Sequence, residues 1–181
     1  MKWIITDTHF NHKNIIKYEN RPENYGQLII DNCKQMIKPD DELYHLGDVI
    51  FAQKGELKYI MSQIPGKKYL TPGNHDRDKK AQWFKDNGFD VVSKYIIIDN
   101  IMLAHHPKDI EPFKPMGVEY MIHGHFHRKS RKELDRTPEF YPFYKLDKYF
   151  NLSVEDMDYK PIPLYTFLQS KISEITSRNN L

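Results

Sequence analysis

Short apolar runs alternate with amphipathic stretches in the first half of the chain. The runs predict β-strands because they are short, rich in aliphatic or aromatic side chains and followed by polar or turn-forming residues: Lys2–Thr6, Glu42–Leu46 and Lys68–Thr71. Apolar positions at helical spacing predict a helix that begins near Glu23 or Asn24 and ends before Pro39, and another over Glu56–Ile64. Strands that alternate with helices indicate an α/β architecture.

The second half of the chain predicts further strands with shorter connections. We expect them at Phe89–Val92, Tyr95–Ile98, Ile101–Ala104, Val118–Ile122 and Leu152–Val154. Asp99-Asn100 predicts a tight hairpin, and short connections favour antiparallel pairing, so we expect mixed sheets. Helical patterns cover Asn11–Asn20, Asp78–Asn87 and Pro163–Ser177. The chain has no internal repeat or linker, which predicts one domain over residues 1–181.

The composition is typical of a globular protein with a polar surface. Of the 181 residues, 39% are hydrophobic and 29% charged, and no apolar run has the length needed to span a bilayer. The N-terminal segment reaches Asp7 too early for a signal peptide, and the single cysteine, Cys33, excludes an internal disulfide. We therefore expect an intracellular, cytoplasmic protein with Cys33 as a packing residue. The net charge of +2 neither requires nor excludes a nucleic acid partner, although a nuclease for long DNA usually has a more basic surface.

Polar side chains that can bind a metal follow five of the apolar runs. They are Asp7, His9, Asp48, Asn74, His105, His125 and His127. Because ligands of α/β proteins gather at the carboxyl ends of strands, these residues predict one shared site. Their oxygen and nitrogen atoms suit Mn²⁺, Fe, Zn²⁺, Ni²⁺ or Co²⁺. Seven ligands are too many for one tetrahedral ion and suit two ions that share a bridging carboxylate, as in enzymes that displace a group at phosphorus.

The order of these motifs resembles that of the calcineurin-like metallophosphoesterases. The motifs are Asp-x-His, Gly-Asp, Gly-Asn-His-Asp, His-x-Pro and Gly-His-x-His, and together they span Asp7 to His127. The segment from His9 to Pro22 is similar to that of the small bacterial and phage-borne members. The resemblance implies a fold of two mixed β-sheets packed as a sandwich and flanked by helices.

The resemblance also implies a division of labour among the residues. Asp7, His9 and His127 would bind one ion, and Asp48 would bridge to the other, which is bound by Asn74, His105 and His125. His105 competes with its neighbour His106 for this role, and the His-x-Pro pattern favours His105. His75 would face the phosphoryl group and stabilise or protonate the leaving oxygen. Asp76 would orient the His75 ring.

Several other residues have two readings at this stage. Arg21 is either a phosphate ligand or a surface arginine before a proline, and His12 is either a substrate contact or a packing residue. His45 and His123 match no ligand position, and an ordinary packing or supporting role is expected for them. The segment Arg128–Phe150 is basic and aromatic, which suits either a nucleic acid contact or a loop whose tyrosines pack on the core.

The expected function is that of a hydrolase dependent on two metal ions, with Mn²⁺ the first choice. A metal-bridging hydroxide would attack a phosphodiester such as a nucleotide, a cyclic nucleotide or a nucleic acid linkage, and His75 would assist the leaving group. The alternatives are a phosphomonoesterase and a non-catalytic interaction scaffold. The scaffold is disfavoured because none of the seven ligands is missing and His75 is present.

Overall fold

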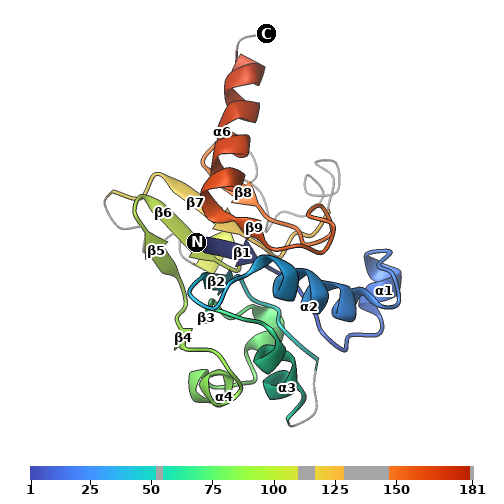
Figure 1. Cartoon of the computed structure of the whole chain (residues 1–181). Coiled ribbons are helices and arrows are strands. Elements are labelled where there is room, and N and C mark those ends of the chain that lie inside the picture. Colours follow the sequence, from blue (N-terminus) through green and yellow to red (C-terminus); the bar gives the residue numbers. More distant parts are fainter. Residues whose placement is uncertain (52–54, 110–116, 129–146, 180–181) are drawn as a thin grey trace.

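A five-stranded sheet lies at the centre of the molecule, with helices on one face and a second sheet on the other (Figure 1). The computed structural model describes residues 1–51, 55–109, 117–128 and 147–179. The strand order of the first sheet is β4-β3-β2-β1-β9. Its strands are β1 (Lys2–Ile5), β2 (Glu42–His45), β3 (Lys67–Leu70), β4 (Val91–Val92) and β9 (Ile162–Pro163). All neighbours are parallel except β1 and β9.

The second sheet has the order β5-β6-β7-β8 and is also mixed. Its strands are β5 (Ile96–Ile98), β6 (Ile101–Ala104), β7 (Tyr120–His123) and β8 (Tyr149–Asn151). The predicted hairpin at Asp99-Asn100 joins β5 to β6, and Asp99 has a φ of +54°. The expectation of mixed sheets is therefore confirmed. Antiparallel pairing was wrong for β6–β7 and β7–β8, which are parallel.

Helices α2 (Tyr25–Met36), α3 (Glu56–Gln63) and α4 (Ala81–Asp86) cover the first sheet. Strand alternation turns Trp3, Ile5 and Leu43 toward these helices, where they join a core that includes Ile29, Cys33, Leu57 and Phe84. Cys33 is fully buried, and burial raises the pKa of its thiol to about 12. The prediction that Cys33 is a packing residue is confirmed.

The alternate residues of the same strands form a second core between the two sheets. Ile4 and Tyr44 of the first sheet share this core with Ile101, Leu103 and Ile122 of the second. Helix α6 (Leu164–Asn179) contributes Leu164 and Phe167, and its far end projects from the body in Figure 1. The α/β class with two mixed sheets and flanking helices is confirmed.

The elements differ from the predicted ones where the hydrophobic pattern is short. The stretch Asn11–Asn20 contains only α1 (Ile15–Tyr18), and the strand expected at Leu152–Val154 lies earlier, as β8. No hydrophobic pattern in the sequence predicted the two-residue strand β9. Its Pro163 has no N–H to donate, and it lies at the edge of the sheet, where one side of the strand needs no hydrogen-bond donor. Residues 129–146 of the basic and aromatic segment lie outside the described residues. None of the described helices has the length and apolar character needed to cross a membrane.

The parallel register aligns the strand ends that carry the polar motifs. Ile5 pairs with His45, and His45 with Leu70, so the loops after β1, β2 and β3 leave the sheet at the same level. In the second sheet Ala104 pairs with His123, which places the loops after β6 and β7 side by side. All five loops therefore emerge along one edge of the two sheets.

Candidate metal centre

Backbone hydrogen bonds join the loops before any ligand is considered. The N–H of Asp7 donates to Gly47 O and that of His9 to Asp48 O, both at 3.0 Å. Across the second sheet, the N–H of Gly124 donates to His105 O at 3.0 Å. These hydrogen bonds hold the loops that carry the candidate ligands next to one another.

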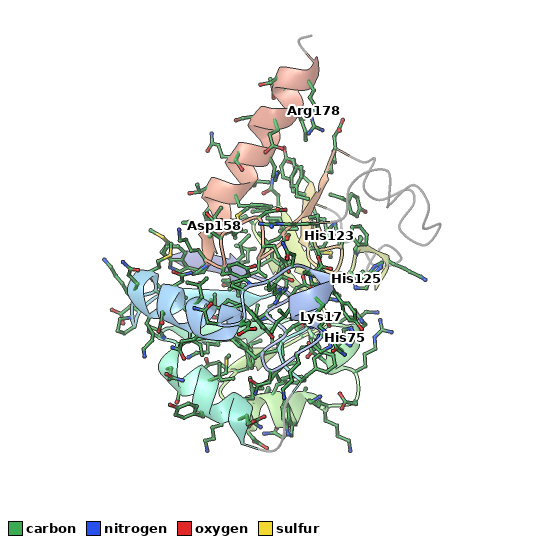
Figure 2. The ribbon with its side chains drawn as sticks, turned by 90° about the vertical axis from the view of Figure 1, so that its right-hand side faces the viewer. Lys17, His75, His123, His125, Asp158 and Arg178 are labelled. Atoms are coloured by element: carbon green, nitrogen blue, oxygen red, sulfur yellow. The ribbon has the colours of Figure 1, made fainter. Side chains whose placement is uncertain are left out.

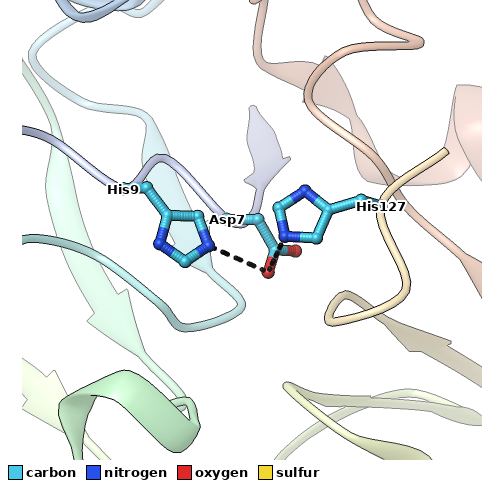
Figure 3. A group of neighbouring side chains, drawn as sticks. All are labelled: Asp7, His9 and His127. Atoms are coloured by element: carbon cyan, nitrogen blue, oxygen red, sulfur yellow. Dashed lines mark ion pairs between the residues drawn. The ribbon is translucent and has the colours of Figure 1, made fainter. Parts of the chain in front are cut away.

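One group of candidate ligands consists of Asp7, His9 and His127 (Figure 3). Both imidazoles turn an Nε2 atom toward the same carboxylate oxygen, Asp7 Oδ1, at 3.9 Å for His9 and 3.7 Å for His127. Asp7 Oδ1 and His9 Nε2 are buried and have no hydrogen-bond partner. Buried polar atoms without a partner are costly, and a cation between them would satisfy both.

Asp48 connects this group to the rest of the site. Its Oδ2 lies 3.6 Å from His9 Nε2, 3.5 Å from His105 Nε2 and 4.0 Å from His75 Nε2. Its other oxygen, Oδ1, accepts the N–H of His75 at 2.9 Å, which holds Oδ2 toward the three rings. A carboxylate in this position can bridge two ions.

A second group contains Asp48, His105 and His125, with the amide of Asn74 between the two rings. Asn74 Oδ1 is 3.0 Å from His105 Nε2 and 2.8 Å from His125 Nδ1. His105 Nδ1 lies 2.7 Å from Leu46 O and donates to it, and in this tautomer Nε2 is the acceptor nitrogen. Two acceptors that face each other at 3.0 Å need a proton or a cation between them, and the donor set of two imidazoles, an amide oxygen and a carboxylate fits a divalent ion.

His105 and its neighbour His106 have different contacts in the structure. His105 joins the group around Asp48, whereas Nδ1 of His106 accepts the N–H of Lys108 at 2.9 Å and its ring packs on that of His125 at 4.4 Å between centroids. The arrangement favours His105 as the ligand.

A carboxylate that the sequence did not point to holds the His127 ring. Nδ1 of His127 lies 3.1 Å from Glu155 Oε1, so Nδ1 donates and Nε2 is left to face Asp7. Histidine ligands of metals are usually oriented by a carboxylate in this way. Burial alone would lower the pKa of His127, but Asp7 and Glu155 outweigh it and raise that pKa to about 9. Glu155 directly follows the strand expected at Leu152–Val154, which was a usable signal, but it belongs to none of the five motifs and was not among the candidate ligands.

Both predicted roles of Arg21, a phosphate ligand and a surface arginine before a proline, were wrong, because the residue is buried under the site. Its side chain is fully buried, its Nε donates to Glu155 Oε1 at 2.9 Å, and its Nη2 pairs with the same oxygen. The two Nη groups also donate to the carbonyls of Thr8 and Asp7 at 2.9 and 2.7 Å. Arg21 therefore holds the Asp7–His9 loop and Glu155 together. The three carbonyl and carboxylate acceptors make burial of the guanidinium favourable.

Asp76 also differs from its predicted role. Its carboxylate is fully buried and accepts three backbone N–H groups: Asp48 at 2.8 Å, Gly73 at 2.9 Å and Val49 at 3.2 Å. Among the described residues no hydrogen bond joins Asp76 to the His75 ring. The prediction that Asp76 orients His75 was wrong, because its oxygens are used to bind the loops after β2 and β3 to each other.

His75 itself lies at the open side of the site. It belongs to a short 3-10 helix, Asn74–Asp76, its side chain is 45% exposed, and its Nε2 is the 4.0 Å neighbour of Asp48. Figure 2 shows His75 and His125 on one side of the body, far from Arg178 at the end of α6. His75 is thus the imidazole that both approaches the ligands and is accessible to solvent.

Comparison with known proteins gives the chain a family but no activity. No family model matches the sequence. An uncharacterized protein of Methanocaldococcus jannaschii, MJ1445, is 33% identical over 170 residues, which cover 90% of this chain and 86% of the relative. This chain belongs to the MJ1445 family. A crystal structure of a protein of unknown function from Aquifex aeolicus, AQ665, is 32% identical, has a TM-score of 0.70 and matches over 90% of this chain and 94% of that one.

Two glycines allow the loops of this MJ1445 family member to approach closely. A Cβ on Gly73 would overlap with Asp48 Oδ1, and a Cβ on Gly124 would overlap with the side-chain oxygens of Thr6 and Asp7. Each glycine directly precedes one candidate ligand and touches another from a different loop. The Gly-Asn and Gly-His pairs therefore follow from packing around the site.

The backbone at the site is strained at most of the candidate ligands. Positive φ values between +46° and +73° occur at Asp7, His9, Asp48, His125 and His127. Left-handed backbone is uncommon for residues with a Cβ, and such residues cluster at functional sites, where the surrounding structure enforces them. In this member of the MJ1445 family, five of the seven candidate ligands adopt it.

The remaining histidines that sequence analysis left open fall into two classes. His45 and His123 are fully buried, and burial lowers the pKa of each to about 3. His45 bonds to Thr8 Oγ1 and to the N–H of Gly47, so it is a packing residue under the site. His12 is half-buried, and its ring stacks on Phe51 near the mouth of the site.

Proposed function

We propose that this chain is a phosphoesterase that depends on two divalent metal ions and belongs to the calcineurin-like metallophosphoesterase superfamily, with that superfamily's sandwich fold. The observation that carries the proposal is Asp48 Oδ2, on which the Nε2 atoms of His9, His105 and His75 converge within 4.0 Å. The motif order along the chain and the two ligand groups that share this carboxylate support it as well. Asp7, His9 and His127 would hold one ion, and Asn74, His105 and His125 the other.

Two divalent ions supply Lewis acidity and a nucleophilic water at neutral pH, and Mn²⁺ suits this oxygen and nitrogen donor set. The chain's own residues supply the rest. Asn74 Oδ1 and the imidazoles of His105 and His125 beside it would limit where a phosphoryl oxygen can approach. His75 stands at the solvent side of this arrangement, so its imidazole would stabilise the developing charge or give a proton to the leaving oxygen.

A phosphodiester is the proposed substrate, because the exposed side of the site gives an ester group room beside His75. The test uses the full chain stripped with EDTA and reloaded with Mn²⁺, assayed on bis-p-nitrophenyl phosphate and on p-nitrophenyl phosphate. We expect hydrolysis of the diester to return with the metal. Hydrolysis of the monoester alone would make the chain a phosphomonoesterase. No turnover of either ester with any of Mn²⁺, Fe²⁺, Zn²⁺, Ni²⁺ or Co²⁺ would reject the enzyme and leave a binding scaffold.

A matched pair of variants tests the ligand assignment without an activity assay. His105→Ala should reduce the stoichiometry of bound Mn²⁺, measured by calorimetry, from two ions toward one. His106→Ala removes the adjacent imidazole and should leave two ions bound. The opposite pattern would assign the ligand to His106.

A further inference from the structure

A large pocket adjoins the candidate metal centre and contains none of the seven ligands. Its volume is about 1030 Å³, and His75 is the residue that it shares with the site. Pockets that bind small organic molecules are usually of this size or smaller. The chemistry of its described lining therefore bears on the organic part of a substrate.

An exposed aromatic ring, Phe51, forms a wall of this pocket. It is 39% exposed, whereas most large apolar side chains of the described residues are buried. Its ring is stacked on the ring of His12, with centroids 3.9 Å apart and planes at 11°, and both residues line the pocket. The pair thus presents a flat and rigid surface.

The position of Phe51 is fixed by the backbone and lies next to the reacting groups. Its N–H donates to Phe10 O at 2.9 Å, beside an isolated parallel bridge between Phe10 and Ile50. Its ring centroid lies 5.0 Å from that of His75 and 5.9 Å from that of His9. A planar group on the open face of Phe51 would therefore lie within reach of an ester oxygen beside His75.

The polar part of the lining suits an uncharged heterocycle rather than a further phosphate. Two lysines, Lys13 and Lys79, line the pocket together with three acidic residues, Glu23, Glu56 and Asp78. Lys79 is already paired with Asp78 at 2.8 Å. The amides of Asn11, Asn24 and Gln27 offer both donors and acceptors for the edge of a ring. The phosphate of a substrate would therefore bind at the metal centre, and the uncharged part of the same substrate would bind in the pocket.

We propose that this pocket binds a nucleobase by stacking on the open face of Phe51, whose other face packs on His12, so that the phosphoesters hydrolysed at the adjacent site are those of nucleosides. The substrate assignment rests on the proposed phosphoesterase function, whereas the binding of the base does not. Stacking of a base on an aromatic side chain typically changes affinity tenfold to a hundredfold on truncation to alanine.

The test measures binding of adenosine to the full chain in EDTA, by NMR titration, so that neither metal nor turnover contributes. Adenosine should bind saturably and ribose should not. Phe51→Ala should weaken adenosine binding at least tenfold, and Phe51→Trp, which keeps a flat ring, should retain it. Tyr59→Ala removes an exposed aromatic ring on α3, outside the pocket lining, and should have no effect.

Equal binding of adenosine and ribose, or adenosine binding that is unchanged by Phe51→Ala, would overturn the proposal. Its failure is distinguishable from failure of the proposed function. Hydrolysis of bis-p-nitrophenyl phosphate without adenosine binding would leave the phosphoesterase and reject the base pocket. Adenosine binding without hydrolysis of any ester would keep the pocket and reject the phosphoesterase.

Discussion

Asp76→Asn separates two roles for a carboxylate that lies next to a proposed catalytic histidine. The substitution keeps the size of the side chain and removes its charge and one acceptor oxygen. In the structure those oxygens accept the N–H groups of Asp48, Gly73 and Val49. The expected result is a loss of stability, because these bonds join the loops after β2 and β3.

The magnitude follows from the three hydrogen bonds. If the Asn oxygen takes the place of Oδ2, two bonds remain but are made to a neutral acceptor, which costs about 1 kcal/mol each. The Asn NH₂ then faces the N–H of Val49, and Val49 is fully buried. An unsatisfied buried donor adds about 1–3 kcal/mol. The sum is about 3–5 kcal/mol, or a decrease of Tm by roughly 6–20 °C for a domain of this size.

The assay compares Asp76→Asn with His75→Ala and with the double variant. Urea unfolding in EDTA should show the full loss for Asp76→Asn and about 0.5 kcal/mol or less for His75→Ala, since the His75 side chain is half-exposed. With Mn²⁺ present, His75→Ala should keep both ions and lose on the order of 10²-fold in the hydrolysis rate. Because no hydrogen bond joins the two side chains, Asp76→Asn should change the hydrolysis rate by a similar factor with and without the His75 imidazole.

One outcome would refute this reasoning. If Asp76→Asn unfolds at the same urea concentration as the parent, and slows hydrolysis only when His75 is present, then Asp76 acts by orienting the imidazole. The role implied by the family resemblance would then be restored.

Three further predictions concern packing and burial. Gly124→Ala should weaken Mn²⁺ binding in calorimetry and lower the free energy of unfolding by about 1–3 kcal/mol, because its Cβ would overlap with Asp7. Its control is Gly26→Ala in α2, where the new Cβ would make an ordinary 3.5 Å contact; this variant should raise the free energy of unfolding by about 0.4–1 kcal/mol. Cys33 should resist Ellman's reagent until guanidinium unfolds the chain, and rapid labelling of the folded protein would contradict its burial. His45 binds a proton more weakly when folded, so it should contribute up to ~1.4 kcal/mol per pH unit to the fall in stability in EDTA from pH 6.5 toward 3, and the total slope should be shallower by that amount in His45→Gln.

The sequence was sufficient to predict the elements with a clear hydrophobic pattern and the convergence of the candidate ligands at one edge of the sheets. β1, β2 and β3 are short apolar runs that end in polar residues, and the parallel register that the α/β pattern implies brings these ends together. The candidate ligands could therefore be grouped before any contact was known. β9 could not be predicted, because a strand of two residues, one of them a proline, is too short to show a hydrophobic pattern. It forms only because the chain pairs there with β1.

The roles of the charged residues around the ligands required the structure. Asp76 lies next to His75 in sequence, but its side chain turns away to the amides of another loop. Arg21 and Glu155 are 134 residues apart, and nothing in the local sequence of either marks the buried pair that they form. Hydrogen-bond direction and burial are properties of the folded chain, so motif order alone cannot assign them.

The left-handed backbone at Asp7, His9, Asp48, His125 and His127 has a cost in stability that depends on which residue stands there. A residue with a Cβ costs about 1–2 kcal/mol there, and glycine would cost almost nothing. The five positions together cost on the order of 5–10 kcal/mol, as much as the net stability of many domains. A chain selected only to stay folded would drift toward glycine at these five positions. The proposed metal centre would account for aspartate and histidine at these five positions.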